Sequence, residues 1–239
     1  MTHKNLKVLV LAAGYGTRLG NLTKNRPKCL MPIGGIPILG IWIKKLEKLN
    51  CKEIIINTHY LSEQVVQYVN NFKTKIKINI VFEEKLLGTA GTLLKNSNYF
   101  LNSECLMIHA DNYTNLDFNK FFLSHRQREK RCIMSMVTFK SNNPKSCGIV
   151  ETNEEGIMIN FEEKPSNPKT NIANGAIYMF DNNLISFIKK KNKNNIIKDF
   201  SNDVIPLLKN KINTWHTKDY IIDIGTIENL KLAMKLSDN

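Results

Sequence analysis

The chain has 239 residues, of which 42% are hydrophobic and 23% are charged, an ordinary composition for a globular protein. This length suits one large α/β domain or two small ones and is ample for a hydrophobic core. No apolar run approaches the roughly 18 residues of a membrane-spanning helix, so we expect no membrane span. The net charge of +13 is spread along the chain, and its densest cluster, Lys189–Lys193, has no interleaved aromatic residues, so we expect no nucleic-acid partner.

The N-terminal stretch and the cysteines both indicate a cytoplasmic protein that does not engage a membrane. The sequence MTHKNLKVLVLAAG has only a short apolar run leading into a glycine turn, which is not the pattern of a signal peptide. The cysteines show neither a CxxC pair nor a His/Cys metal spacing, so we expect reduced, mostly buried thiols. They are Cys29, Cys51, Cys105, Cys132 and Cys147.

The first 130 residues alternate between strand-like and helix-like patterns. Strands alternating with helices at this spacing build βαβ units, so we predict a Rossmann-like α/β fold with three α/β/α layers and a mainly parallel mixed central sheet. Asn50 is a predicted helix C-cap and Ser62 a predicted N-cap. The expected strands are Lys7–Ala13, Glu53–Asn57, Lys77–Phe82 and Cys105–His109, and the expected helices are Ile38–Leu49, Ser62–Asn71, Thr89–Asn96 and Asp117–Arg128.

The pattern changes after residue 130, where strands joined by turns predict a mixed or antiparallel patch. We expect one domain, 1–239, with halves 1–130 and 131–239. In the second half the expected strands are Cys132–Phe139, Cys147–Glu151, Ile157–Glu163, Ala173–Phe180, Ile212–His216 and Tyr220–Asp223, and the expected helices are Asn183–Lys191, Asp199–Lys209 and Ile227–Leu236.

The stretch LAAGYGTRLGNLTKNRPKCLMP after the first strand has the composition of a phosphate site. Gly14 and Gly16 let backbone amides approach a phosphate closely, because no Cβ stands in the way. Arg18 and Lys28 then supply cations that offset the charge of a polyphosphate. The residues themselves therefore predict a site for a nucleoside triphosphate.

Two further features lie where ligands of open α/β sheets collect, beyond the carboxyl ends of strands. Glu83–Gly91 is a second glycine loop, and Asp111 follows the strand Cys105–His109 directly. Taken alone, Asp111 could equally cap a turn or a helix. His109 is interpreted as a core histidine, and His59 remains open between a structural role and a place at the site.

Segments in a fixed order over nearly the whole chain resemble the sugar-1-phosphate nucleotidylyltransferases. They are LAAGYGTRL, PKCLMPI, LLGTAG, HADN, EEKP, ANGAIYMF and DIGT. One departure is Ala110, where that family often has glycine before the acid. The chain ends one helix after DIGT, so we expect it to lack the C-terminal domain of the longer relatives. The resemblance implies transfer of a nucleotidyl group from a nucleoside triphosphate to a sugar 1-phosphate, with release of pyrophosphate.

The resemblance also implies a role for each cluster of residues. Arg18, Lys28 and Lys164 would neutralise phosphates, while Asp111 and Asp223 would hold one Mg²⁺. No protein nucleophile is needed, because a phosphate is already ionised at neutral pH. Halves 1–130 and 131–239 would bind nucleotide and sugar phosphate, and a homodimer is left open. The nucleotide-binding residues implied are Leu11, Ala12, Ala13, Gly14, Gly16, Thr17, Arg18, Lys28, Glu83, Gly88, Thr89 and Asp111, and the sugar-phosphate-binding residues are Asn112, Gly148, Glu163, Lys164, Asn174 and Gly175.

The nucleotide base is inferred from Glu83, which the resemblance places at the base. A carboxylate only accepts hydrogen bonds, and guanine presents N1–H and N2–H₂ as adjacent donors. Uracil, thymine and cytosine present fewer donors on that edge. The loop LLGTAG also resembles the guanylyltransferase branch that acts on mannose 1-phosphate and manno-heptose 1-phosphate. We therefore favour GTP with a mannose-type or heptose-type sugar.

Three alternatives stay open at this stage. The first is cytidylyl or uridylyl transfer to another sugar 1-phosphate. The second is transfer to a small phosphorylated alcohol such as phosphocholine, which predicts an aromatic cage that could recruit Tyr113, Phe161 and Tyr178. The third is a catalytically silent regulatory subunit, which predicts loss of the charged residues that are in fact present.

Overall fold

The computed structural model describes residues 5–237, and contacts divide the chain into two compact units. The first unit comprises the chain up to Leu86, Met107–Asn115 and the chain from Ile221; the second comprises Leu87–Leu106 and Leu116–Tyr220. Both units therefore take residues from either side of position 130 and do not follow the predicted halves, while the single domain 1–239 stays a prediction. Residues 1–4, the start of the stretch from which we expect a cytoplasmic protein, lie outside the described residues.

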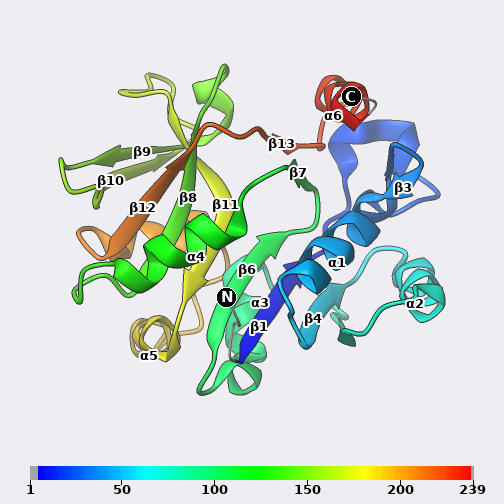
Figure 1. The fold of residues 1–239 in the computed structure, drawn as a ribbon, viewed down its shortest axis with the longest axis horizontal. Coiled ribbons are helices and arrows are strands. Elements are labelled where there is room, and N and C mark those ends of the chain that lie inside the picture. Colours follow the sequence, from blue (N-terminus) through cyan, green and yellow to red (C-terminus); the bar gives the residue numbers. More distant parts are fainter. Residues whose placement is uncertain (1–4, 238–239) are drawn as a thin grey trace. The chain divides into compact units, whose positions relative to one another are not determined.

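Parallel strands form the sheet of the first unit (Figure 1). β1 (Leu6–Leu11) pairs in parallel with β4 (Glu53–Thr58), which pairs in parallel with β5 (Lys77–Phe82). β6 (Glu104–His109), whose residues are shared between the units, neighbours β1. The α/β fold with a mixed, mainly parallel central sheet flanked by helices is confirmed. Two small antiparallel pairs complete the strands of this unit, β2 (Pro32–Ile33) with β3 (Ile36–Pro37), and β7 (Asn112–Thr114) with β13 (Ile221–Asp223).

The helices of the first unit are α1 (Ile38–Lys48), α2 (Ser62–Asn71) and α6 (Ile227–Ser237). The predicted apolar stripe of α1 is buried, with Leu39 and Leu46 both 0% exposed. The C-cap of α1 is Leu49, and the predicted C-cap Asn50 follows it. Asn50 has φ of 56°, a left-handed conformation that asparagine tolerates. The N-cap prediction for Ser62 is wrong, since Leu61 is the N-cap and Ser62 is the first helical residue.

Antiparallel pairs dominate the sheet of the second unit, as predicted. β9 (Gly148–Thr152) pairs with β10 (Met158–Glu163) and β11 (Ile172–Phe180), and β11 pairs with β8 (Met134–Lys140). β12 (Ile212–Thr217) is parallel to β8. The unit also holds α3 (Thr89–Lys95), α4 (Phe118–Gln127), whose N-cap is Asp117, and α5 (Asn182–Lys191).

The segment predicted as a helix over Asp199–Lys209 is broken into two different turns. Phe200–Val204 is a π-helix and Ile205–Leu208 is a 3₁₀-helix. Pro206 explains the break, because it has no N–H to donate and its ring clashes with the preceding helical turn. Short 3₁₀ turns that the sequence pattern did not indicate lie at Thr17–Thr23, Lys28–Leu30, Ser97–Phe100 and Pro144–Ser146.

Two expectations about solubility and redox chemistry can be checked in the described residues. No helix among residues 5–237 has both the length and the apolar character needed to cross a membrane. All five cysteines are free thiols, and only Cys147 is not fully buried. Burial raises the pKa of the Cys29 thiol to about 12, so this thiol is protonated at neutral pH.

A buried histidine predicts that acid weakens the fold. His125 is 2% exposed, its Nδ1 lies 2.8 Å from the Ser135 hydroxyl, and burial, with the charges of Arg128 and Arg126, lowers its pKa to about 3. Between pH 6.5 and 3 the unfolded chain therefore binds a proton that the folded chain does not, and stability falls as pH falls. We expect a loss of about 2 kcal/mol at pH 5 relative to pH 7, measured by urea unfolding.

The matched variant is His125→Gln, whose amide can still bond Ser135 but does not titrate. Its stability between pH 7 and pH 5 should change less than that of the wild type by about the same 2 kcal/mol. Equal pH dependence in the two proteins would show that His125 is not the group responsible.

Candidate active site

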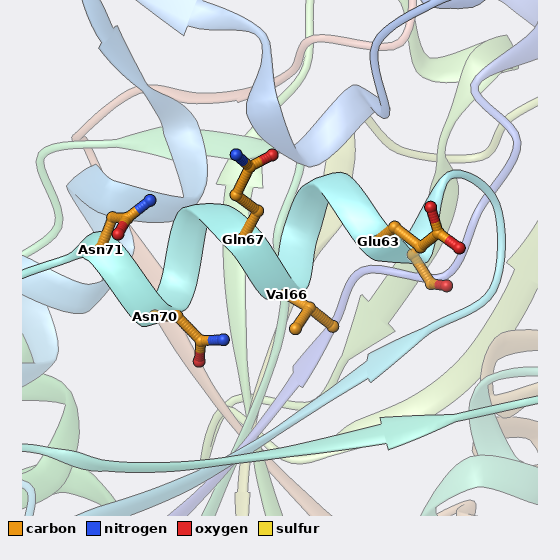
Figure 2. Close-up of a pocket in the computed structure, with 6 residues that line it drawn as sticks. Glu63, Val66, Gln67, Asn70 and Asn71 are labelled. Atoms are coloured by element: carbon orange, nitrogen blue, oxygen red, sulfur yellow. The ribbon is translucent and has the colours of Figure 1, made fainter.

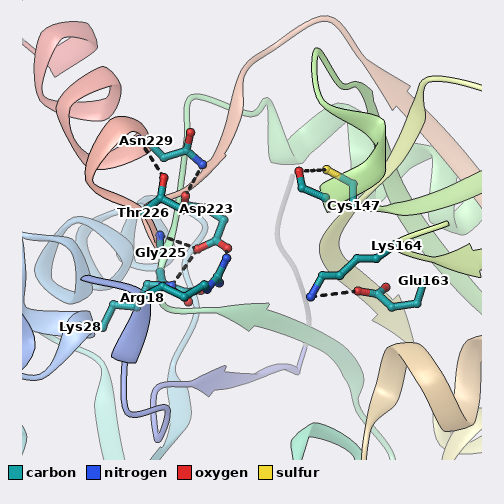
Figure 3. A network of polar contacts seen from close by, with 11 residues as sticks. Arg18, Lys28, Cys147, Glu163, Lys164, Asp223, Gly225, Thr226 and Asn229 are labelled. Atoms are coloured by element: carbon teal, nitrogen blue, oxygen red, sulfur yellow. Dashed lines mark hydrogen bonds and ion pairs between the residues drawn. The ribbon is translucent and has the colours of Figure 1, made fainter. Parts of the chain in front are cut away.

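A lysine between two aspartates is the central feature of the first unit. Figure 3 labels Lys28, Arg18 and Asp223 of this cluster. The Nζ atom of Lys28 lies 2.5 Å from Asp111 Oδ2 and 2.8 Å from Asp223 Oδ1. Arg18 Nη2 lies 3.0 Å from the other oxygen of Asp223. The structure thus brings together the four charged residues that the sequence predicts at the reacting phosphates, from positions 18, 28, 111 and 223.

Each member of this cluster is placed by the end of a local element. Lys28 begins a 3₁₀ turn after Pro27, whose fixed φ sets the direction of entry. Asp111 follows β6, and Asp223 is the last residue of β13. Because Asp223 pairs with Asn112 in the β7–β13 ladder, and Ile224 N donates to Asp111 O at 3.0 Å, the two acids are held side by side.

Burial and charge together set the protonation of the cluster. The Lys28 side chain is only 9% exposed, and burial alone would lower its pKa. The charges and hydrogen bonds of Asp111 and Asp223 outweigh that effect, so the pKa of Lys28 is raised and the ammonium persists. Burial alone would likewise raise the pKa of Asp223, but Lys28 and Arg18 hold it below its ordinary value.

The backbone after β13 fixes the Asp223 carboxylate from a third side. Gly225 N donates to Asp223 Oδ1 at 2.8 Å, and the Asn229 amide donates to the Asp223 carbonyl at 2.8 Å. A Cβ at Gly225 would lie 2.6 Å from Arg18 Nη2 and 2.7 Å from Lys28 Nζ. A side chain at the glycine of the DIGT segment would therefore shift the charged ends of Arg18 and Lys28.

The two carboxylates have the chemistry of a Mg²⁺ site that is completed by substrate. Mg²⁺ is commonly held by one or two carboxylates, with phosphates and waters filling its other positions. Asp111 and Asp223 already converge on one cation, the Lys28 ammonium, which shows that both can face the same positive charge. Among residues 5–237 no group of three or more potential ligands from His, Cys, Asp and Glu occurs, and the role of this pair as metal ligands stays a prediction.

The predicted phosphate loop is exposed and tightly turned. Gly14 and Thr17 are exposed, while Gly16 has φ of 69°, a left-handed conformation that favours glycine. A Cβ at Gly16 would lie 3.0 Å from Thr23 Cγ2, and the Thr23 hydroxyl donates to the Gly16 carbonyl. Of the apolar residues expected at the nucleotide, Leu11 and Ala13 are buried.

Asn57 is a residue of this region that the sequence reading missed. Its Oδ1 accepts from Ala12 N at 2.8 Å, and its Nδ2 donates to Glu83 Oε1 at 2.9 Å. Glu83 is consequently 1% exposed, so its predicted contact with a base, which stays a prediction, requires the carboxylate to become accessible. The strand run EIIIN gave no functional signal, because a polar residue at a strand end is common.

His59 connects the phosphate loop to the main chain beside Glu83. Its Nδ1 lies 2.7 Å from the Glu83 carbonyl and its Nε2 lies 2.8 Å from the Tyr15 hydroxyl. Tyr15 is 46% exposed and stands between the two glycines of the loop. His59 thus contacts the phosphate loop itself, and the choice between a structural role and a place at the site stays open.

The second unit gathers the residues predicted at the sugar phosphate. Gly148 pairs with Glu163 across β9 and β10, and a Cβ at Gly148 would lie 2.6 Å from Glu163 Oε2. Burial raises the pKa of Glu163, and the charge of Asp199 adds to this effect. Lys164 Nζ lies 3.8 Å from Glu163 Oε1, and its side chain is 61% exposed (Figure 3).

Asn174 lies in β11, where the register of the pairing with β8 shifts. Its Nδ2 donates to the Tyr178 hydroxyl at 2.7 Å, and its Oδ1 accepts from Ala176 N. Gly175 is buried. Asn112, which was grouped with the sugar phosphate, belongs to the first unit, where it is 6% exposed in β7.

Hollows elsewhere on the surface hold none of the predicted site residues. One of about 450 Å³ runs along α2 and is lined by Ser62, Glu63, Val66, Gln67, Asn70 and Asn71 (Figure 2). These side chains are mostly uncharged amides and hydroxyls, with a single carboxylate. The hollow lacks the cations that a phosphorylated ligand requires, so the charged cluster is the stronger candidate.

Comparison with known proteins gives a consistent family. The model of the family described as Nucleotidyl transferase matches residues 7–238. The bifunctional protein GlmU of Methanocaldococcus jannaschii is 34% identical over 77% of this chain and 42% of its own length. The D-glycero-alpha-D-manno-heptose 1-phosphate guanylyltransferase of Campylobacter jejuni is 28% identical over 93% of this chain and 96% of its own length.

The solved structures show a similar fold. The crystal structure of HddC from Yersinia pseudotuberculosis complexed with GMP-PN superposes with a TM-score of 0.80 at 24% identity, covering 96% of this chain and 98% of that one. Other relatives are named glucose-1-phosphate adenylyltransferase, so the nucleotide named differs among them. The chain spans about half the length of the first curated relatives it matches, 50% and 42%.

Gly225 offers a direct test of how tightly the cluster is packed. Gly225→Ala should lower the free energy of unfolding by about 1–3 kcal/mol, because the new methyl group overlaps the two cations and the Asp223 carboxylate. Urea unfolding would measure the loss. Gly14→Ala is the matched control, since a Cβ there meets nothing within 4 Å. Equal stability of the two variants would contradict the packing described above.

Proposed function

Because the chain belongs to the nucleotidyl transferase family, we propose that it transfers a nucleotidyl group from a nucleoside triphosphate to a sugar 1-phosphate and releases pyrophosphate. The observation that carries the proposal is the nearly buried Lys28 ammonium held by Asp111 and Asp223, with Arg18 beside it. A hydrolase and a transferase could both use the glycine loop. The match along residues 7–238, including the Lys164 and Asp223 segments, favours transfer.

The reaction brings two polyanions together, so the main task of the protein is to neutralise charge and to align the reacting groups. Lys28 acts near the α-phosphate, where a cation shielded from water stabilises developing charge most strongly. Arg18, which pairs with Asp223 and whose side chain is 61% exposed, binds the β- and γ-phosphates through the N–H donors of its planar guanidinium. The sugar phosphate supplies its own ionised oxygen as nucleophile.

Asp111 and Asp223 would hold Mg²⁺, a proposal supported by their convergence on one cation. When bound there, Mg²⁺ supplies positive charge that polarises phosphate oxygens. The residues of the chain then have distinct tasks. Gly225 N orients the Asp223 carboxylate, and the charges of Lys28 and Arg18 keep the pKa of Asp223 below its ordinary value.

In the second unit, Lys164 neutralises the phosphate of the incoming sugar. Its exposed ammonium can leave Glu163, since a contact of 3.8 Å to a largely exposed lysine is weak. Glu163 and Asn174 then offer oxygen and amide groups to the sugar hydroxyls. Gly148 leaves room for Glu163 and Phe161, since a Cβ there would lie 2.6 Å from an atom of each, and its contact with the sugar stays a prediction.

We favour GTP and a mannose-type or heptose-type sugar 1-phosphate. The support comes from the relative named as a heptose 1-phosphate guanylyltransferase, which matches this chain over 96% of its own length. The burial of Glu83 removes the simplest reason for preferring guanine, because the carboxylate is occupied by Asn57. The names of the adenylyltransferase relatives keep ATP in the test.

Transfer to phosphocholine is less well supported. A quaternary amine needs aromatic faces that it can reach. Tyr178 is 0% exposed and Phe161 is 8% exposed, so two of the three rings proposed for such a cage are enclosed by the second unit.

The first test is release of pyrophosphate with Mg²⁺, using four nucleoside triphosphates against glucose, mannose and heptose 1-phosphates. We expect GTP with a mannose-type or heptose-type substrate to give the highest kcat/KM. A higher kcat/KM with ATP would overturn the base assignment alone. Absence of release for every pair, from protein with a cooperative unfolding transition, would overturn the proposed function.

The second test removes one carboxylate charge at a time. Asp111→Asn and Asp223→Asn should each lower kcat by at least about 100-fold, because each removes charge that orients Lys28 and a candidate metal ligand. Asp181→Asn is the matched control, since Asp181 also pairs with an arginine, Arg128 at 2.8 Å, in the second unit. Near-normal turnover of either site variant at limiting Mg²⁺ would show that the one-metal account is wrong.

A further inference from the structure

In the second unit, a segment far along the chain is hydrogen-bonded to Gly88–Gly91. These residues comprise Gly88 and the first turn of α3, and we call them the Gly88–Gly91 loop. We call Lys198–Val204 the connecting segment; it contains the π-helix Phe200–Val204. The carbonyl of Lys198 accepts from Ala90 N at 2.8 Å and from Gly91 N at 3.1 Å. A Cβ at Gly88 would lie 2.4 Å from that same carbonyl, so the approach depends on glycine.

Thr89 joins the loop and the connecting segment through its hydroxyl. Its Oγ1 accepts from Phe200 N at 2.6 Å and donates to Asp199 Oδ2 at 3.3 Å. Asp199 is also the N-cap of the π-helix, since its Oδ1 accepts from Asn202 N at 2.8 Å. The hydroxyl that the sequence assigned to nucleotide binding is therefore already engaged within the protein.

The connecting segment also contacts the residues of the sugar-phosphate group. The Phe200 ring packs on the Tyr178 ring with centroids 4.8 Å apart, and the Tyr178 hydroxyl accepts from the Asn174 amide. Tyr178 and Phe200 are 0% and 1% exposed, so this contact is rigidly enclosed. The charge of Asp199 is also felt by Glu163, whose pKa it helps to raise.

We propose that Asp199 and Thr89 are positioning residues, which hold the Gly88–Gly91 loop in its nucleotide-binding orientation and tie that loop, through Phe200 and Tyr178, to Asn174. The proposal rests on the proposed function for the identity of the substrates. A π-helix is a costly conformation that is enriched at functional sites. In this π-helix the Phe200 N–H donates to Thr89 Oγ1, and the Phe200 ring packs on the Tyr178 ring.

The test compares Thr89→Val, which keeps the shape and removes the hydroxyl, with Thr89→Ser, which keeps the hydroxyl. With GTP and mannose 1-phosphate, Thr89→Val should raise the KM for nucleotide about tenfold and lower kcat less than twofold, and Thr89→Ser should restore the KM. A purely structural role would instead reduce the fraction of folded protein, which lowers the apparent kcat and leaves the KM unchanged. That result would overturn the proposal.

Asp199→Asn gives an independent arm. One amide oxygen cannot accept from both Asn202 and Thr89, so the KM for nucleotide should rise. The double variant with Thr89→Val should have a KM no higher than that of the more impaired single variant. Asp117→Asn is the matched control, because Asp117 caps α4 in the same unit and its carboxylate bonds only within that first turn. Additive effects of the two changes would show that Asp199 does not act through Thr89.

Amide hydrogen exchange separates this proposal from the proposed function. At a GTP concentration near the wild-type KM, with Mg²⁺, the Ala90 and Gly91 amides should gain more protection over the ligand-free protein in the wild type than in Thr89→Val. If no substrate pair releases pyrophosphate, the proposed function fails, and the exchange experiment still decides whether the connecting segment controls nucleotide binding at the loop. Equal protection in both proteins, or none in either, would overturn the positioning role.

Discussion

A nearly buried ammonium group that requires two carboxylates governs the construction of the first unit. A charge taken out of water costs several kcal/mol unless it is paired and hydrogen-bonded. Lys28 meets this requirement with Asp111 after β6 and Asp223 at the end of β13. The short β7–β13 ladder places Asp223 beside Lys28, and the glycine at position 225 leaves room for the Lys28 ammonium there. The region where we propose phosphate binding is thus a region where the first unit concentrates charge.

The second unit positions its residues mainly with hydrogen bonds between neutral groups, together with the Asp199 carboxylate that accepts from Thr89. A backbone carbonyl and the Thr89 hydroxyl hold the loop at Gly88, and Asn174 donates to Tyr178. Such hydrogen bonds are directional in an enclosed setting. The first unit therefore relies on paired charges where the second relies mainly on directional hydrogen bonds.

Much of the fold and the charged cluster could be predicted from the sequence. α2 and β5 have the predicted bounds, because their periodicity is strong and turn residues flank them. Arg18 and Lys28 were predicted from the glycine-rich stretch and Asp111 from its place after a strand, whereas Asp223 was predicted from the resemblance of DIGT to the family's segment.

What could not be predicted depends on contacts that leave no local pattern. Asn57 reads as the end of a strand, and only its position between Ala12 N and Glu83 gives it a role. Thr89 and Asp199 are 110 positions apart. The helix expected from Asp199 was wrong because Pro206 competes with the apolar pattern. The division at residue 130 treated the chain as two successive pieces, whereas each unit draws on separated stretches.

The separation of Lys28 from its partners has a consequence for biosynthesis. Asp111 lies 83 positions after Lys28 and Asp223 lies 195 positions after it. A chain that leaves the ribosome from its N-terminus exposes the lysine first, then one acid, and the other only after Tyr220 has completed the second unit. The inserted unit can therefore fold before the unit that surrounds it in sequence, and the long loops that must close make the last step slow. During translation the cluster of Arg18, Lys28, Asp111 and Asp223 is thus completed last.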